Sequence, residues 1–179
     1  MSVDSEEIEW TPDFSMKPEY FLGVVDNSDP HDARTRAGVN YFFEHSVEEN
    51  KKRYKIKIKN IWVRAYFFPH GSWIREKILG EISLPKLLKH EQGHFDLAER
   101  SARRFERRLK NKFQNKTFSY NKNLVSDPVV EIRYSIQMEF EILNEEVEQG
   151  HKNYDKLTNH GLILKEQEKF DTRFAQLRN

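Results

Sequence analysis

The sequence predicts an α+β fold, with a small antiparallel sheet in its N-terminal half followed by long helices. Two observations lead to this prediction. Between Tyr54 and Lys59, apolar residues alternate with lysines, which is typical of a strand with one buried face. After Ser83 and again after Ser126, apolar residues recur at intervals of three and four, the spacing of a helix with one buried face.

The length of 179 residues suits a single domain. We place this domain at residues 1–179, with residues 1–80 mostly in strands and loops and residues 81–179 mostly helical. A chain of this size buries roughly two-thirds of its unfolded surface, which is enough for a core without disulfides.

The predicted sheet has two main strands. Residues 39–47 are rich in β-branched and aromatic side chains, and residues 54–68 begin with the alternating pattern. The charged segment 48–53 between them is expected to be a turn, so the strands form a hairpin or a small antiparallel sheet. The second strand has one polar, basic face, which consists of Lys55, Lys57 and Lys59. Residues 1–38 are expected to be mostly loops, with a short extended piece at Ile8-Glu9-Trp10.

The first long helix is predicted to begin near Ser83-Leu84-Pro85. Ser83 is expected to be the N-cap, and Pro85 suits the first turn, where its missing amide hydrogen costs nothing. The apolar positions at helical spacing are Leu84, Leu87, Leu88, Phe95, Ala98, Ala102, Phe105 and Leu109. The charge-dense run from Arg100 to Lys112 is then mostly the exposed face of this helix.

The second long helix is predicted to begin at Ser126-Asp127-Pro128, again a capping residue followed by proline. The segment from Ile132 to Ile142 alternates like a strand, but apolar residues also follow helical spacing from Val129 to Leu157. Since strands rarely exceed about ten residues, we predict a helix. Gly161 is expected to end it, and residues 163–177 are expected to form a third helix.

Charge and composition exclude several classes of protein. The 30 Lys and Arg residues are balanced by 29 Asp and Glu, and this net charge of +1 gives no broad positive field for nucleic acid. No segment approaches the length of about 18 apolar residues that a transmembrane helix needs. The start, MSVDSEEIEW, lacks the basic and apolar regions of a signal peptide. Without cysteine, any metal must be bound by His, Asp or Glu.

The most informative segment is His90-Glu91-Gln92-Gly93-His94, an H-E-x-x-H motif inside the first predicted helix. A spacing of four places both imidazoles on one face of the helix, one turn apart, which suits two ligands of a single zinc ion. Glu91 lies beside the first ligand, where it can take a proton from a zinc-bound water. Gly93 adds no side chain and leaves room for a close neighbour.

A catalytic zinc with two histidine ligands and a water lacks one protein ligand. The extended motif H-E-x-x-H-x-x-G-x-x-H is absent, because the chain has Leu97 and Arg100 in place of its Gly and last His. His160 lies at the end of the second predicted helix, which reaches the site if the two helices pack antiparallel. The alternative is a histidine that interacts with the helix C-terminus. The carboxylate alternatives are Asp155, Glu145 and Glu146, and the histidines expected at the surface or in a turn are His31, His45 and His70.

Three further side chains near the motif have two interpretations each. Asp96 and Glu99 either orient a ligand imidazole or form ion pairs with Arg100 or Arg103. Tyr154 either donates a hydrogen bond to a developing oxyanion or packs inside the fold.

Residues 87–99, LLKHEQGHFDLAE, resemble the signature of a bacterial family described as zinc-dependent proteases and first catalogued as a domain of unknown function. HEQGHFD is the specific part of this block. Residues 154–161, YDKLTNHG, are also similar to the family. The weaker similarities are Ile8-Glu9-Trp10, Ala33-Arg34-Thr35, Gln167 and Phe170. Phe170 stands where the family more often has Trp, and Leu157 where it often has Glu.

The resemblance implies a single zincin-like domain with a zinc-bound water. It also implies His160 as the third ligand, because the family ends its long helix with the same T-x-H-G pattern. Members of the family are commonly exported, so the resemblance implies a periplasmic or secreted protein, whereas the expected lack of a leader implies a cytoplasmic one.

Together, these features predict a zinc metallopeptidase that hydrolyses peptide bonds in a peptide or protein substrate. His90, His94 and His160 are expected to hold Zn²⁺, and Glu91 is expected to act as the general base. Two alternatives stay open. One is a non-catalytic zinc-containing binding domain, and the other is a metal hydrolase that acts on a non-peptide amide or ester.

Overall fold

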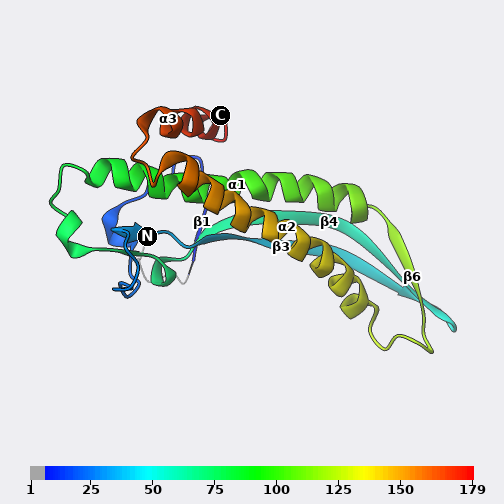
Figure 1. The fold of residues 1–179 in the computed structure, drawn as a ribbon. Helices are drawn as coiled ribbons and strands as arrows, with labels where there is room; N and C mark the ends of the chain where they lie inside the picture. The colour runs from blue at the N-terminus through cyan, green and yellow to red at the C-terminus, as the bar shows by residue number, and fades with distance from the viewer. Residues whose placement is uncertain (1–6) are drawn as a thin grey trace.

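A computed structural model describes residues 7–179 of the chain and shows a mixed α/β fold with an N-terminal antiparallel sheet followed by helices (Figure 1). The central strand is β4 (Arg53–Phe67), which pairs along its length with β3 (Ala37–Glu49). Its other edge pairs with β1 (Ile8–Glu9) near one end and with β6 (Thr117–Asn121) near the other. The predicted hairpin is therefore confirmed as the centre of a larger sheet.

Three helices follow the sheet: α1 (Leu84–Phe113), α2 (Pro128–Thr158) and α3 (Leu164–Ala175). In Figure 1, α1 runs along the sheet, α2 lies beside both, and α3 lies near the start of α1, away from the strands. A second, two-stranded ladder pairs β2 (Ala33–Arg34) with β5 (Trp73–Ile74). The short 3₁₀ helices are η1 (Pro18–Tyr20), η2 (Pro69–Gly71) and η3 (Glu76–Ile78).

The core lies between the sheet and the two long helices. Ile56 and Ile58 of β4 are fully buried, and so are Phe105 of α1 and Ile132 of α2. The register between β3 and β4 shifts after Glu44, which pairs with Asn60, because the next β3 residue pairs with Ile58. The skipped residue is Lys59, a β-bulge that lets the apolar positions on both sides of it face the helices.

The second long segment is a helix, as predicted, rather than a strand. Ile132 and Ile136 are fully buried, whereas Tyr134 and Met138, which alternate with them, are largely exposed. Burial of alternate residues would also fit a strand, but the segment forms one continuous helix that ends at Thr158. The helical spacing of the apolar residues was therefore the correct indicator of its structure.

The two predicted helix starts differ in their capping. Asp127 caps α2 as expected, because its side chain accepts a hydrogen bond from the Val129 amide. Ser83 occupies the N-cap position of α1, as predicted, but the expected side-chain capping bond is not formed. Ser83 has helical backbone angles and its side chain accepts no capping hydrogen bond, because the preceding residues already turn into the helix through the bond from Leu84 to Glu81.

The sequence prediction missed strand β6, which pairs with residues 53–57 of β4. This strand has only five residues and lies in the connection between the two long helices. Residues 1–6, on which the expected absence of a signal peptide partly rests, lie outside the described residues.

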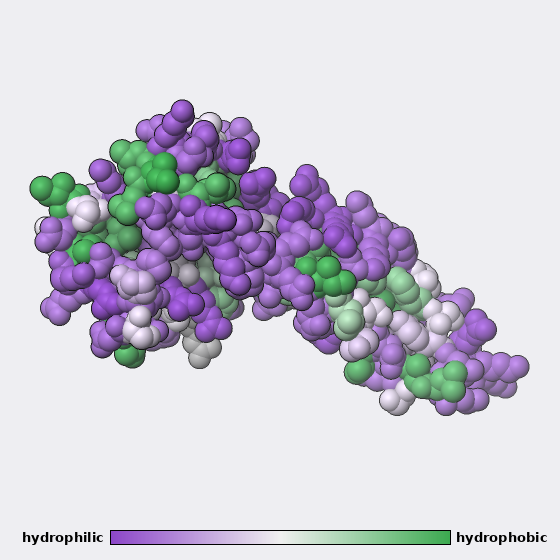
Figure 2. Space-filling view, in the orientation of Figure 1, coloured by the Kyte–Doolittle hydropathy of each residue, from purple (hydrophilic) through white to green (hydrophobic). Residues whose placement is uncertain are grey.

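The visible surface is mostly hydrophilic, with small, separate apolar areas (Figure 2). This fits a chain in which 33% of the residues are charged. Among residues 7–179, no helix combines the length and the apolar character needed to cross a membrane.

Candidate metal centre

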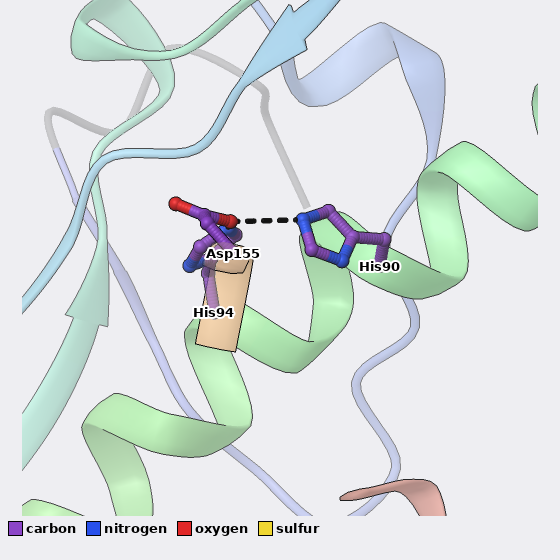
Figure 3. Close-up of side chains that lie close together, drawn as sticks. All are labelled: His90, His94 and Asp155. Atoms are coloured by element: carbon purple, nitrogen blue, oxygen red, sulfur yellow. Dashed lines mark hydrogen bonds and ion pairs between the residues drawn. The ribbon is translucent and has the colours of Figure 1, made fainter. Parts of the chain in front are cut away.

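The H-E-x-x-H motif lies on the buried face of α1. His90, Glu91 and His94 are 1%, 3% and 8% exposed. Three charged or polar side chains this deeply buried are costly unless they have partners or a function. The C-terminal end of α2 crosses this part of α1 and brings Asp155 against both histidines (Figure 3).

Asp155 joins the two histidines at one oxygen atom. Its Oδ1 lies 3.1 Å from Nε2 of His90 and 2.9 Å from Nε2 of His94. One donor atom from each of the three residues lies within 4.8 Å of the others. The chain therefore places two imidazole nitrogens and a carboxylate oxygen around one point.

The charges of this cluster stabilise one another. Burial alone raises the pKa of Asp155, but hydrogen bonds from His90 and His94 outweigh it and hold that pKa well below the usual range. Burial opposes protonation of His94, yet its hydrogen bond to Asp155 and the nearby charge of Glu91 raise its pKa overall. The site therefore favours an ionised carboxylate next to positive charge.

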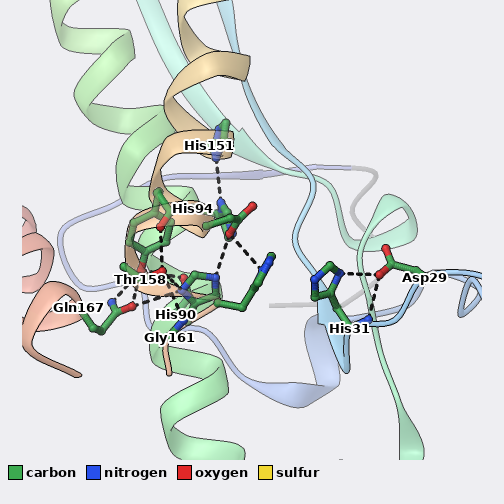
Figure 4. A network of polar contacts seen from close by, with 11 residues as sticks. Asp29, His31, His90, His94, His151, Thr158, Gly161 and Gln167 are labelled. Carbon is green, nitrogen blue, oxygen red and sulfur yellow. Dashed lines mark hydrogen bonds and ion pairs between the residues drawn. The ribbon is translucent and has the colours of Figure 1, made fainter. Parts of the chain in front are cut away.

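The Nδ1 atom of each histidine also has a partner, so both Nε2 atoms point inward (Figure 4). Nδ1 of His90 lies 3.2 Å from Oε1 of Gln167 on α3, and Nδ1 of His94 lies 2.9 Å from Nδ1 of His151 on α2. Burial and the neighbouring His94 lower the pKa of His151 to about 3, so its ring is neutral and can accept the hydrogen of His94 Nδ1. Such partners fix the tautomer and orientation of metal-binding histidines.

Tyr154 packs the two helices together at the motif. Its ring is fully buried and stacks on His90 at 4.7 Å, and its hydroxyl group donates to the His90 carbonyl and accepts from Nε2 of Gln167. The room that Gly93 was expected to leave is filled by this tyrosine, because a Cβ atom at Gly93 would lie 2.1 Å from the tyrosine Oη. The packing interpretation of Tyr154 therefore holds, and its hydroxyl group faces α1 and α3.

His160 lies at the edge of the cluster. It belongs to a left-handed turn in which Asn159, His160 and Gly161 have φ values of 47°, 53° and 80°. Its Nδ1 is 3.6 Å from Oδ1 of Asp155, and its ring lies 3.9 Å from the ring of His31. The turn thus brings His160 to the site, as predicted, but places Asp155 closer to both motif histidines. The assignment of His160 as a ligand stays a prediction.

His31 and His151 were not predicted at the site. His31 lies just before β2 and forms a 2.6 Å contact with Asp29, which orients its ring toward His160. His151 lies one turn before Asp155 on the same side of α2. Their sequence neighbourhoods are polar and carry no motif, so only the packing of distant segments reveals them.

Glu91 lines a cavity of about 650 Å³ together with His90, His94 and Asp155. Its Oε2 atom is buried and has no hydrogen-bond partner among residues 7–179. A buried carboxylate oxygen with no protein partner is costly, and it is free to bind a ligand or a water in the cavity. The other walls come from α2, from residues 33–37 and from Trp73.

Asp96 and Glu99 contact no motif histidine. Glu99 pairs with Arg103 at 2.7 Å, so the ion-pair interpretation is confirmed for this residue. Asp96 accepts hydrogen bonds from Trp10 at 2.8 Å and from Arg178 at 2.7 Å. It therefore joins the N-terminal segment and the C-terminus to α1 rather than orienting a ligand.

The donor set fits zinc. Neutral imidazole nitrogens and one carboxylate are ordinary zinc ligands, and the converging Nε2 atoms have the outer partners that such sites use. Of the three carboxylates considered from the sequence, Asp155 is the one that lies with the two histidines, whereas Glu146 pairs with Arg104.

Comparison of the chain with known protein families, with curated proteins and with solved structures finds no match.

Proposed function

We propose that the chain is a zinc-dependent metallopeptidase of zincin-like architecture. The observation that carries this proposal is the buried cluster of His90, His94 and Asp155 on one wall of a cavity that also contains the unpaired carboxylate of Glu91. The H-E-x-x-H motif on a long helix beside an antiparallel sheet, and the resemblance of HEQGHFD to zinc-dependent proteases, support the same function.

The metal would be held by Nε2 of His90 and Nε2 of His94, with a third ligand from Asp155 or His160. A zinc ion bound there would lower the pKa of a water molecule and polarise a substrate carbonyl. Gln167 and His151 hold the two histidine rings in the orientation that points both Nε2 atoms toward Asp155, where the metal would bind.

Glu91 would act as the general base. It follows the first ligand on α1, so its carboxylate lies beside the metal-binding face, and Oε2 has no protein partner among residues 7–179. It can take a proton from water and then deliver it to the amine that leaves when the peptide bond breaks.

The variant Glu91→Gln tests this role because it keeps the shape of the side chain and removes its basicity. We expect zinc binding to persist and hydrolysis of a denatured protein substrate to fall by about 10²–10⁴-fold, the usual contribution of a general base. Glu99→Gln, on the same helix but paired with Arg103, is the matched control and should keep full activity. Hydrolysis that survives in Glu91→Gln would refute the mechanism.

The third ligand is tested by comparing Asp155→Ala with His160→Ala. The variant that removes a ligand should lose zinc affinity strongly, whereas removal of a neighbour should change it little. Zinc affinity that is unchanged in both variants would contradict a three-ligand site built from these residues.

A second candidate function is a non-catalytic zinc-containing binding domain. The observation that favours it is the 3.6 Å distance between His160 and Asp155, since both side chains together would give the metal four protein ligands. Structural zinc sites are closed in this way, whereas catalytic sites keep an open position. The absorption spectrum of the cobalt-substituted protein distinguishes the two, because an added small anion changes the spectrum of an open site and not of a closed one.

A further inference from the structure

We propose that the cavity selects substrates that carry a carboxylate group, which Arg36 and Lys152 bind beside the metal centre. This proposal rests on the proposed function and names its substrate class. Both basic side chains line the same cavity as Glu91 and the metal-binding cluster, and they come from separate elements, the segment before β3 and helix α2.

The structure holds Arg36 in place on the cavity wall. Its amide donates a 2.8 Å hydrogen bond to Oγ of Ser72, and its carbonyl accepts a 2.9 Å bond from the Phe68 amide. Its guanidinium group lies 5.6 Å from the centre of the Phe68 ring. Its side chain also runs against Gly71, where a Cβ atom would lie 2.6 Å from Cδ of Arg36. Two of these contacts hold the backbone of Arg36 and two hold its side chain, so this side chain loses less freedom on binding a ligand than an unsupported one would.

Two of the acidic residues that line the cavity already have other partners. Asp29 is bound to His31, and Asp155 is bound to the two motif histidines. Among residues 7–179, neither Arg36 nor Lys152 forms a salt bridge, and Glu148, which lies one helical turn before Lys152 on α2, does not pair with it.

A carboxylate is the ligand that this arrangement fits best. The planar guanidinium group of arginine binds a carboxylate through two parallel hydrogen bonds, and a lysine adds a point charge. In a peptide, the carboxylate comes either from an Asp or Glu side chain or from the C-terminus. Both sources present the same chemistry, so the experiment uses peptides that separate them.

The test measures binding in the zinc-loaded Glu91→Gln protein, which retains the cavity but does not turn over its ligand. Three fluorescent peptides of one sequence are compared: one with an internal Glu and a C-terminal amide, one with Gln in its place and the amide, and one with Gln and a free C-terminus. We expect one of the two peptides with a carboxylate to bind about tenfold more tightly than the neutral peptide, the effect of one charge-assisted hydrogen bond.

The same comparison in Arg36→Gln and Lys152→Gln identifies the groups that bind. Arg36→Gln should remove most of the preference and Lys152→Gln part of it, whereas Lys55→Gln, on the exposed face of β4, should leave it unchanged. Equal binding of all three peptides would overturn the proposal, and so would a preference that persists without Arg36, since the carboxylate would then bind the metal directly.

Hydrolysis by the unaltered protein separates this proposal from the proposed function. Cleavage of all three peptides at equal rates would overturn the carboxylate site and leave the peptidase intact. Carboxylate-dependent binding without any cleavage would support the site and contradict the peptidase.

Discussion

Replacing Gly93 with alanine should disrupt the contact between the two long helices at the proposed metal centre. A Cβ atom at this position would lie 2.1 Å from Oη, 2.6 Å from Cζ and 3.1 Å from Cε1 of Tyr154. The tyrosine has no free space to move into, because its ring is fully buried between His90 and Phe170. Either Tyr154 leaves its position or the helices separate.

The cost has two parts. Overpacking of a well-packed core costs about 1–3 kcal/mol. Loss of the hydrogen bond from Tyr154 to the His90 carbonyl adds about 1 kcal/mol. A total of about 3 kcal/mol lowers the melting temperature of a chain of this size by roughly 6–12 °C.

Thermal unfolding followed by circular dichroism measures this effect, and Gly150→Ala is the matched control. Gly150 lies in α2, and a Cβ atom there would meet nothing within 4 Å, so alanine should stabilise the helix by about 1 kcal/mol. Opposite shifts in the two variants are expected. Tyr154→Phe should rescue Gly93→Ala only in part, since the contact with Cζ remains. An unchanged melting temperature in Gly93→Ala would refute the packing described for Tyr154.

Three other predictions concern the support of the site, the core and the response to acid. Gln167→Leu and His151→Phe should each weaken zinc binding by about 10–100-fold in a competition titration, because each removes the partner of a ligand histidine, with little change in the circular dichroism spectrum. Phe105→Ala should lower the free energy of unfolding by about 3–5 kcal/mol in a denaturant titration, because Phe105 is fully buried between the sheet and α2. A hydrogen bond from Lys112 lowers the pKa of Glu139, so this contact contributes stability at neutral pH that is lost as the pH falls through that lowered pKa. Glu139→Gln should therefore cost about 1 kcal/mol at pH 7 and almost nothing at pH 2, measured by denaturant unfolding at both pH values.

The regular elements were predictable because their periodicity reflects burial. The alternation from Tyr54 to Lys59 gave the central strand, and the spacing of apolar residues gave both long helices. Strand β6 was not predictable, since five residues between two helices carry too short a pattern. The N-cap position of Ser83 was predictable, but the absence of its side-chain capping bond was not, because that bond depends on the path of the chain before the helix.

The local part of the site was predictable and the distant part was not. The spacing of His90 and His94 places them on one face of the helix, irrespective of how the rest of the chain folds. Which group of α2 meets them depends on where that helix crosses α1 and on the left-handed turn that follows Thr158. Asp155 was therefore one carboxylate alternative among three, and His151 was assigned no role at the site.

The central claim is that the face of α1 containing His90 and His94 binds one zinc ion. Titration of the metal-free protein with zinc against a chromophoric chelator tests it directly, with His94→Ala as the test variant and His70→Ala, an exposed histidine in η2, as the control. We predict one zinc per chain, with an affinity that His94→Ala lowers by more than about a hundredfold, since loss of a ligand exceeds loss of its outer partner. Zinc binding at full affinity in a folded His94→Ala protein would contradict the account.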